Sequence, residues 1–154
     1  RNAAKNAVPK AACNGASQLR PKAFYIGVDS SEFAVRRWGR RRNLRLGSFR
    51  DLASAGLGNP YDLVVCSDVL HYVPDRDLDA GLAALCELLN GVAWIEFFTS
   101  GDRITGDFRD MKRRSAAAYD RRFRRAGLVH CGLFTLVRDD FAPGVTTFER
   151  GRNA

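Results

Sequence analysis

Residues 61–75 read Tyr-Asp-Leu-Val-Val-Cys-Ser-Asp-Val-Leu-His-Tyr-Val-Pro-Asp, and this stretch decides the fold more than any other. Its aliphatic run from Leu63 to Cys66 predicts a buried strand, which the turn-like Gly58-Asn59-Pro60 introduces. Small polar residues follow at the tip of the strand, and Pro74-Asp75 then provides a helix start. The stretch therefore predicts a strand, a polar strand end and the beginning of a helix.

The predicted helix begins at Asp75 or Asp77 and has one leucine stripe. Its leucines recur at the i, i+3/i+4, i+7 spacing of a buried helix face, at positions 78, 82, 85, 88 and 89. Asn90-Gly91 follows directly, and glycine is common just after a helix end. We therefore expect the helix to stop there and the next strand to cover residues 92–98.

Upstream of this stretch, strands and helices alternate. The apolar residues 23–28 predict a strand, and Ser30 or Ser31 can cap the helix that follows it. A short strand is expected over residues 44–46, before Gly47.

Downstream, residues 99–114 form a polar stretch that is too long for a routine turn, and we expect a lid or binding loop. Ser115 should cap another helix, with Gly127 as its stop. The last strand candidates are residues 128–137 and 145–148, joined through Pro143-Gly144.

This order of elements predicts an α/β fold. Alternating strands and helices favour a doubly wound, mostly parallel sheet with helices on both faces, here with a C-terminal antiparallel hairpin. A chain of 154 residues with 45% hydrophobic residues can bury one core, so we expect a single domain over residues 23–154. No apolar run approaches the ~18 residues of a membrane span, and we expect no membrane association.

The net charge of +8 is unevenly distributed along the chain. Residues 1–50 carry a net +10 and residues 101–154 a net +5, whereas residues 51–100 carry −7. The predicted strand ends of the middle block thus lie in an acidic part of the chain, which favours a cationic ligand over a phosphate.

The cysteines give no sign of a metal site or a disulfide framework. Cys13, Cys66, Cys86 and Cys131 form no C-x-x-C pair, and no histidine lies at metal-ligand spacing from them. Free thiols are typical of a reducing compartment, and residues 1–10 contain no apolar signal-peptide core. We therefore expect no metal and a cytoplasmic protein.

Ligands of such sheets bind at the carboxyl ends of the strands. Asp29 follows the first predicted strand, where a carboxylate can accept both hydroxyls of a ribose, or can merely cap the next helix. Gly47-Ser48-Phe49 follows the second, where a backbone N–H and a hydroxyl could read an adenine edge. The third strand end begins with Cys66 and Ser67.

Together, these strand ends resemble those of the class I S-adenosylmethionine-dependent methyltransferases. The resemblance rests on Gly27-Val28-Asp29-Ser30-Ser31, on Gly47-Ser48-Phe49 and on residues 61–75, in this order, and it covers roughly residues 23–150. The third motif is specific, and the first two support it by their position. The resemblance implies a Rossmann-like fold and S-adenosylmethionine as cofactor.

The resemblance also implies roles for individual residues. Asp29, with Ser30 beside it, would accept the ribose hydroxyls, and Ser48 and Phe49 would border the adenine. Cys66 and Ser67 would lie beside the methionine part, mainly through backbone groups.

His71 would face the methyl-transfer region, as a general base or as a group that orients the substrate. Its alternative is a hydrogen-bonded residue at a helix entry. Glu96, a carboxylate in an otherwise apolar strand, needs a partner or a place at the sheet end. We do not count Glu96 as catalytic.

The sequence departs from the family at its start. The first strand and glycine-rich loop should precede Tyr25, but residues 1–22 contain only Cys13-Asn14-Gly15 as a faint equivalent, so they count as a partial N-terminal segment. A fragment or joined set of pieces, a strand supplied by a partner, and a degenerate fold would each explain this.

Three functions remain open. The first is methyl transfer to a small-molecule acceptor. The second is an RNA methyltransferase or RNA-binding module, suggested by the arginines within residues 36–45 and 113–125. The third is a non-catalytic, methyltransferase-like partner subunit, suggested by the missing first motif.

Overall fold

The computed structural model describes residues 23–105 and 110–145. The chain divides into two compact units, Arg1–Gly58 and Asn59–Ala154, and each is described by itself. The expected first motif falls in residues 1–22, outside the described residues. The single domain expected over residues 23–154 stays a prediction.

The first unit contains one pair of parallel strands, and a helix connects the two strands along the chain. Its elements are β1 (Gly27–Asp29), α2 (Glu32–Arg42), β2 (Leu44–Leu46) and the 3₁₀ helix η2 (Phe49–Ser54). β1 and β2 pair in parallel, with Asp29 opposite Leu46. Both strands therefore end at the same edge.

Local sequence signals explain the ends of α2. The Ser31 hydroxyl accepts a hydrogen bond from the Ala34 N–H at 3.2 Å, which satisfies one of the free amides at the helix start. Asn43 closes the helix in the left-handed conformation, with φ 44°. The sequence prediction of a serine cap is thus confirmed at Ser31.

The second unit contains a four-stranded sheet in the order β3-β4-β6-β5. Its elements are β3 (Tyr61–Ser67), the 3₁₀ helix η3 (Leu70–Tyr72), α3 (Asp75–Glu87), β4 (Leu89–Glu96), α4 (Ala116–Arg125), β5 (Leu128–His130), β6 (Thr135–Arg138) and α5 (Ala142–Val145). β3 and β4 are parallel, and β6 pairs antiparallel with both β4 and β5.

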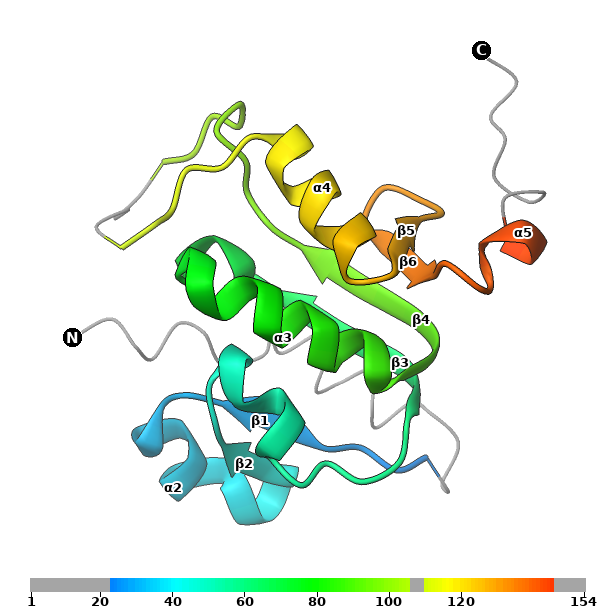
Figure 1. The fold of residues 1–154 in the computed structure, drawn as a ribbon. Helices are drawn as coiled ribbons and strands as arrows, with labels where there is room; N and C mark the ends of the chain where they lie inside the picture. Colours follow the sequence, from blue (N-terminus) through cyan, green and yellow to red (C-terminus); the bar gives the residue numbers. More distant parts are fainter. Residues whose placement is uncertain (1–22, 106–109, 146–154) are drawn as a thin grey trace. The chain divides into compact units, whose positions relative to one another are not determined.

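Helices α3 and α4 lie along the same face of this sheet, as Figure 1 shows. Ala93 and Ile95 of β4 face them and are fully buried, as are Leu82 of α3 and Phe123 of α4. Burying a side chain as large as Ile95, Leu82 or Phe123 contributes roughly 1.5–3 kcal/mol. On the other face of β3 and β4 the apolar side chains are 37–53% exposed, at Leu63, Val65, Val92 and Trp94.

Asn90-Gly91 does not end the helix, so that expectation is wrong. α3 ends at Glu87, and Asn90 and Gly91 lie inside β4. A Cβ at Gly91 would come within 2.3 Å of the Asp62 carbonyl oxygen, where the pairing of β3 with β4 shifts register. The glycine is therefore explained by a close approach of two strands rather than by a helix stop.

The C-terminal hairpin lies earlier than expected. The predicted strand over residues 128–137 is two antiparallel strands, β5 and β6, and residues 131–134 connect them. Pro143 and Gly144 belong to α5, and residues 146–148 of the second strand candidate lie outside the described part. The α/β fold with parallel strands and a late antiparallel hairpin is confirmed.

Candidate functional site

Asp29 ends β1 and is buried, with 8% of its surface exposed. Its Oδ1 accepts a hydrogen bond from the Ser31 N–H at 2.8 Å. Within the described residues, no donor contacts the other oxygen, Oδ2. No side-chain oxygen of the described residues is both fully buried and without a partner, so Oδ2 keeps contact with solvent and is available for a hydroxyl of a ligand.

Ser48 and Phe49 follow β2 at the same edge. The Gly47 N–H donates to the Asp29 carbonyl oxygen at 3.1 Å, which links the two strand ends. The Ser48 hydroxyl donates to Asp51 Oδ2 at 2.6 Å, and the Ser48 N–H donates to the same oxygen at 3.3 Å. Both bonds lower the pKa of the Asp51 carboxyl. Ser48 is therefore the N-cap residue of η2 and is tied to Asp51 in its first turn, a role that sequence reasoning missed.

Of the other two residues expected here, Phe49 is half-buried as the first residue of η2, and Ser30 is exposed. The first unit thus brings Asp29, Ser30, Ser48 and Phe49 to the ends of two adjacent strands.

Cys66 and Ser67 end β3 in the second unit. Cys66 is buried, and burial raises the pKa of its thiol to about 12, so the thiol stays protonated and is no nucleophile. The Ser67 hydroxyl donates to Glu96 Oε2 at 2.6 Å. Glu96 ends β4 opposite Ser67, so this carboxylate has both the partner and the strand-end position that its place in an apolar strand requires.

His71 lies in η3 and is 1% exposed. Its Nδ1 accepts a long hydrogen bond of 3.4 Å from the Phe98 N–H, and the Tyr72 and Phe98 rings lie against it. Burial lowers the pKa of the imidazole, and the charge of Arg114 adds to this, while Asp68 opposes it. His71 is therefore neutral near pH 7, and the bond to Nδ1 assigns its proton to Nε2.

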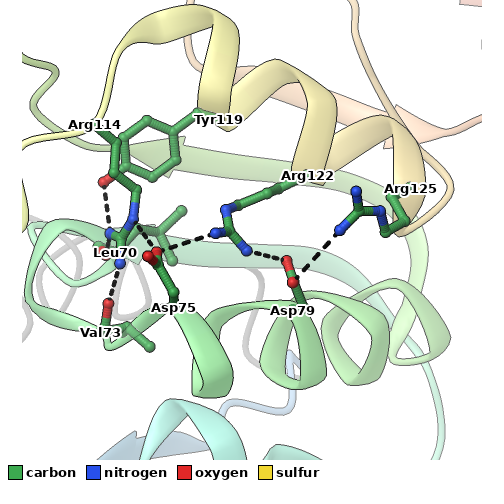
Figure 2. A network of polar contacts seen from close by, with 8 residues as sticks. All are labelled: Leu70, Val73, Asp75, Asp79, Arg114, Tyr119, Arg122 and Arg125. Atoms are coloured by element: carbon green, nitrogen blue, oxygen red, sulfur yellow. Dashed lines mark hydrogen bonds and ion pairs between the residues drawn. The ribbon is translucent and has the colours of Figure 1, made fainter.

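Arg114 is the main residue that sequence reasoning missed. Its side chain is 8% exposed and donates to the carbonyl oxygens of Leu70 and Val73, to Asp75 Oδ1 and to the Tyr119 hydroxyl. Figure 2 shows this network continuing along α3 and α4. There Arg122 contacts Asp75 and Asp79, and Arg125 contacts Asp79.

The one signal for this network in the sequence is the spacing of its charges. Asp75 and Asp79 are four residues apart on α3, and Arg122 and Arg125 are three apart on α4, so each pair occupies one helix face. The spacing does not reveal that the two faces meet.

The described residues offer no metal site, since no three His, Cys, Asp or Glu side chains gather there. Cys66 and Cys86 are free thiols. Among the described helices, none is long and apolar enough to cross a membrane.

Comparison with known proteins relates the chain to solved structures alone, because no family model and no curated protein matches it. One similar structure is an O-methyltransferase from neocarzinostatin biosynthesis in complex with S-adenosyl-L-homocysteine and 1,4-dihydroxy-2-naphthoic acid, at 23% identity and a TM-score of 0.54. The match covers 72% of this chain and 40% of that one.

A second similar structure is a putative O-methyltransferase from Nostoc punctiforme, also at 23% identity and a TM-score of 0.54. It is matched over 74% of this chain and 41% of its own. The chain thus spans about two fifths of the length of these proteins. The likeness shows the fold, and the chain has the α/β fold of the class I S-adenosylmethionine-dependent methyltransferases.

Proposed function

We propose that the protein transfers a methyl group from S-adenosylmethionine to a hydroxyl of a small-molecule acceptor. The observation that carries the proposal is the buried Asp29 at the end of β1, in a fold shared with O-methyltransferases. One of these relatives holds S-adenosyl-L-homocysteine and a dihydroxynaphthoic acid, which supports a cofactor of this kind and a small hydroxylated acceptor.

The described residues fit this cofactor. Asp29 Oδ2 receives no donor from the described residues, so it can accept a ribose hydroxyl. Phe49 supplies a half-buried ring for the adenine, and Ser48 supplies backbone groups, because its hydroxyl is engaged with Asp51. In the second unit, taken by itself, Cys66 and Ser67 offer backbone groups to a ligand, since the thiol is protonated and the hydroxyl is bonded to Glu96.

When bound, S-adenosylmethionine supplies a methyl group that its sulfonium has already activated. The protein's task is then mainly to align the acceptor. His71 is neutral and carries its proton on Nε2, so it orients the acceptor by donating a hydrogen bond to the acceptor oxygen. Removal of the acceptor proton by Nε2 first requires the other tautomer, which breaks the bond from the Phe98 N–H.

The test is methyl transfer from isotopically labelled S-adenosylmethionine to a panel of hydroxylated aromatic acids, with 1,4-dihydroxy-2-naphthoic acid first. We expect a methylated product, and Asp29→Asn should raise KM for the cofactor. The matched control is Asp62→Asn, an exposed aspartate near the start of β3, which should leave the rate unchanged. A panel without product, or an Asp29→Asn variant as active as the wild type, would overturn the proposal.

RNA methylation is a second candidate, favoured by the exposed arginines of α2. Arg36, Arg37, Arg40 and Arg41 contact no carboxylate in the part of the chain that the structure describes. Label incorporated into RNA in the same assay, and lost at higher salt, would favour this candidate over a small acceptor.

The proposed location is the cytoplasm. The free thiols of Cys66 and Cys86 support a reducing compartment.

A further inference from the structure

We propose that Arg114 is a positioning residue that holds His71 in place. The proposal rests on the proposed function, in which His71 faces the acceptor. Arg114 lies 44 residues after Leu70 and 41 after Val73, and it contacts the backbone on both sides of His71 rather than the imidazole itself.

Arg114 binds a pair of carbonyl oxygens, one at each end of the turn. Nη1 donates to the Leu70 oxygen at 3.0 Å, and Nη2 donates to the Val73 oxygen at 2.5 Å. Leu70 immediately precedes His71, and Val73 ends the turn. One guanidinium therefore spans both ends of η3.

The guanidinium of Arg114 is itself fixed by other contacts. Its Nε donates to Asp75 Oδ1 at 2.7 Å, and Nη1 also donates to the Tyr119 hydroxyl at 3.2 Å, with the guanidinium 5.6 Å from the Tyr119 ring centre. Asp75 begins α3, and Tyr119 is fully buried in α4. Arg114 thus ties η3 to both helices, as Figure 2 shows.

The backbone around Arg114 also holds the turn η3. The Lys112 N–H donates to the His71 carbonyl oxygen at 2.6 Å, and the Ser100 N–H donates to the Arg114 carbonyl oxygen at 2.7 Å. Phe98, two residues before Ser100, is the donor to His71 Nδ1. The segment after β4, the segment before α4 and η3 are therefore held together around the imidazole.

This arrangement has a consequence that a general stabilising role lacks. If η3 loosens, Nδ1 loses the Phe98 N–H, water reaches the ring, and both tautomers of neutral His71 become populated. The pKa of His71 then rises toward its ordinary value, because burial is its main depressing influence. Asp68 and Arg114 are the charged groups that act on the ring, and Tyr72 and Phe98 pack against it.

Lysine cannot replace this arginine. A guanidinium donates in several fixed directions at once, whereas an ammonium on a flexible stem cannot reach two carbonyls, a carboxylate and a hydroxyl together. Arg114→Lys therefore keeps the positive charge and removes the directed hydrogen bonds. The variant separates the effect of the charge from the effect of the hydrogen bonds.

The experiment is NMR titration of the histidine rings, with no cofactor or acceptor present. The chain has two histidines, His71 and His130, so His130 on β5 is an internal reference. In the wild type we expect the Nε2–H tautomer and a lowered pKa at His71. In Arg114→Lys and Arg114→Met the pKa should rise and the tautomers should mix, while His130 stays unchanged.

The matched control is Arg122→Met, which removes an arginine from the same ion-pair network without touching Leu70 or Val73. It should leave His71 unchanged. Circular dichroism reports whether each variant folds, and Tyr119→Phe, which removes one Arg114 partner, gives a milder test with a smaller shift in the same direction.

Three results would overturn the proposal. His71 could keep its tautomer and pKa in folded Arg114 variants, Arg122→Met could shift His71 equally, or both Arg114 variants and Tyr119→Phe could unfold. The last result would make Arg114 a part of the core rather than a holder of the turn. A failure of the proposed function is a separate result, because the NMR experiment needs no methyl transfer.

Discussion

Helices α2 and α4 have similar compositions and different surroundings. α2 carries five arginines in 11 residues, and α4 carries four in ten. In α4, Arg122, Arg124 and Arg125 contact Asp75, Asp79 or Asp120. Four arginines of α2, Arg36, Arg37, Arg40 and Arg41, contact no carboxylate among the described residues.

The difference comes from the neighbour of each helix. α4 packs beside α3, which presents Asp75 and Asp79 one turn apart. α2 packs on β1 and β2, whose sequences, Gly-Val-Asp and Leu-Arg-Leu, offer one carboxylate, and Asp29 is bonded to the Ser31 N–H. The same residue type thus links two helices in one unit and remains a surface charge in the other.

Part of the basic charge of the chain is used within the fold. Half of the arginines that suggested RNA binding lie within residues 113–125, and four of these, Arg114, Arg122, Arg124 and Arg125, form ion pairs within the fold. The exposed arginines of α2 are the ones that still favour RNA binding.

The strongest test of the contrast compares Arg114→Met with Arg40→Met. Loss of Arg114 leaves the Leu70 and Val73 carbonyl oxygens without their buried donor, and each such loss costs about 1–3 kcal/mol. We expect the free energy of unfolding to fall by about 3 kcal/mol, measured by urea denaturation. Arg40→Met should change it by no more than about 0.5 kcal/mol, and equal losses would contradict the contrast.

Asp79→Asn sharpens the comparison at the acidic side of the α3–α4 contact. Asp79 contacts both Arg122 and Arg125, but its side chain is 41% exposed, so solvent screens the pairs. We expect a loss of about 0.5–1 kcal/mol in urea denaturation. The loss should shrink at high salt, and a loss that is independent of salt would mean that charge is not the cause.

The pH dependence of stability tests His71. The pKa of its imidazole is lower in the folded protein than the ordinary value of 6.5, so the unfolded chain binds more protons below that value. The stabilisation is fully present above about pH 6.5 and is lost as the pH falls through the folded pKa. His71→Gln should flatten the curve below about pH 6.5, and an unchanged curve would contradict the lowered pKa.

The smallest expected effect on stability is at α2. Replacing Arg36, Arg37, Arg40 and Arg41 together with glutamine should change the free energy of unfolding by no more than about 0.5 kcal/mol. Binding to single-stranded RNA, measured as salt-dependent retention, should fall if these arginines form an RNA surface. Wild-type protein that binds no RNA at low salt would leave them as solvated charges and remove the RNA candidate.

The strand ends were predictable because their signals are local. Asp29 and Ser48 follow the two parallel strands of the first unit, and Ser67 ends β3 of the second unit opposite Glu96, so each lies at the carboxyl end of a parallel strand. The serine caps at Ser31 and Ser115 follow from the same local logic.

The missed features depend on residues that are distant in sequence. Gly91 resembles a helix stop until Asp62, 29 residues earlier, is placed against it. Arg114 lies in a polar stretch like any loop arginine, and its partners Leu70, Asp75 and Tyr119 come from three other elements. Nothing in the local pattern around Arg114 distinguishes it from Arg113, which is exposed.

The most direct test of the account is isothermal titration of the wild-type chain and of Asp29→Asn with S-adenosyl-L-homocysteine. We expect the wild type to bind one equivalent and Asp62→Asn to bind as the wild type does. We expect Asp29→Asn to bind at least about tenfold more weakly, because a charge-assisted hydrogen bond is worth more than 1.4 kcal/mol. The absence of binding to the wild type, or equal binding by Asp29→Asn, would contradict it.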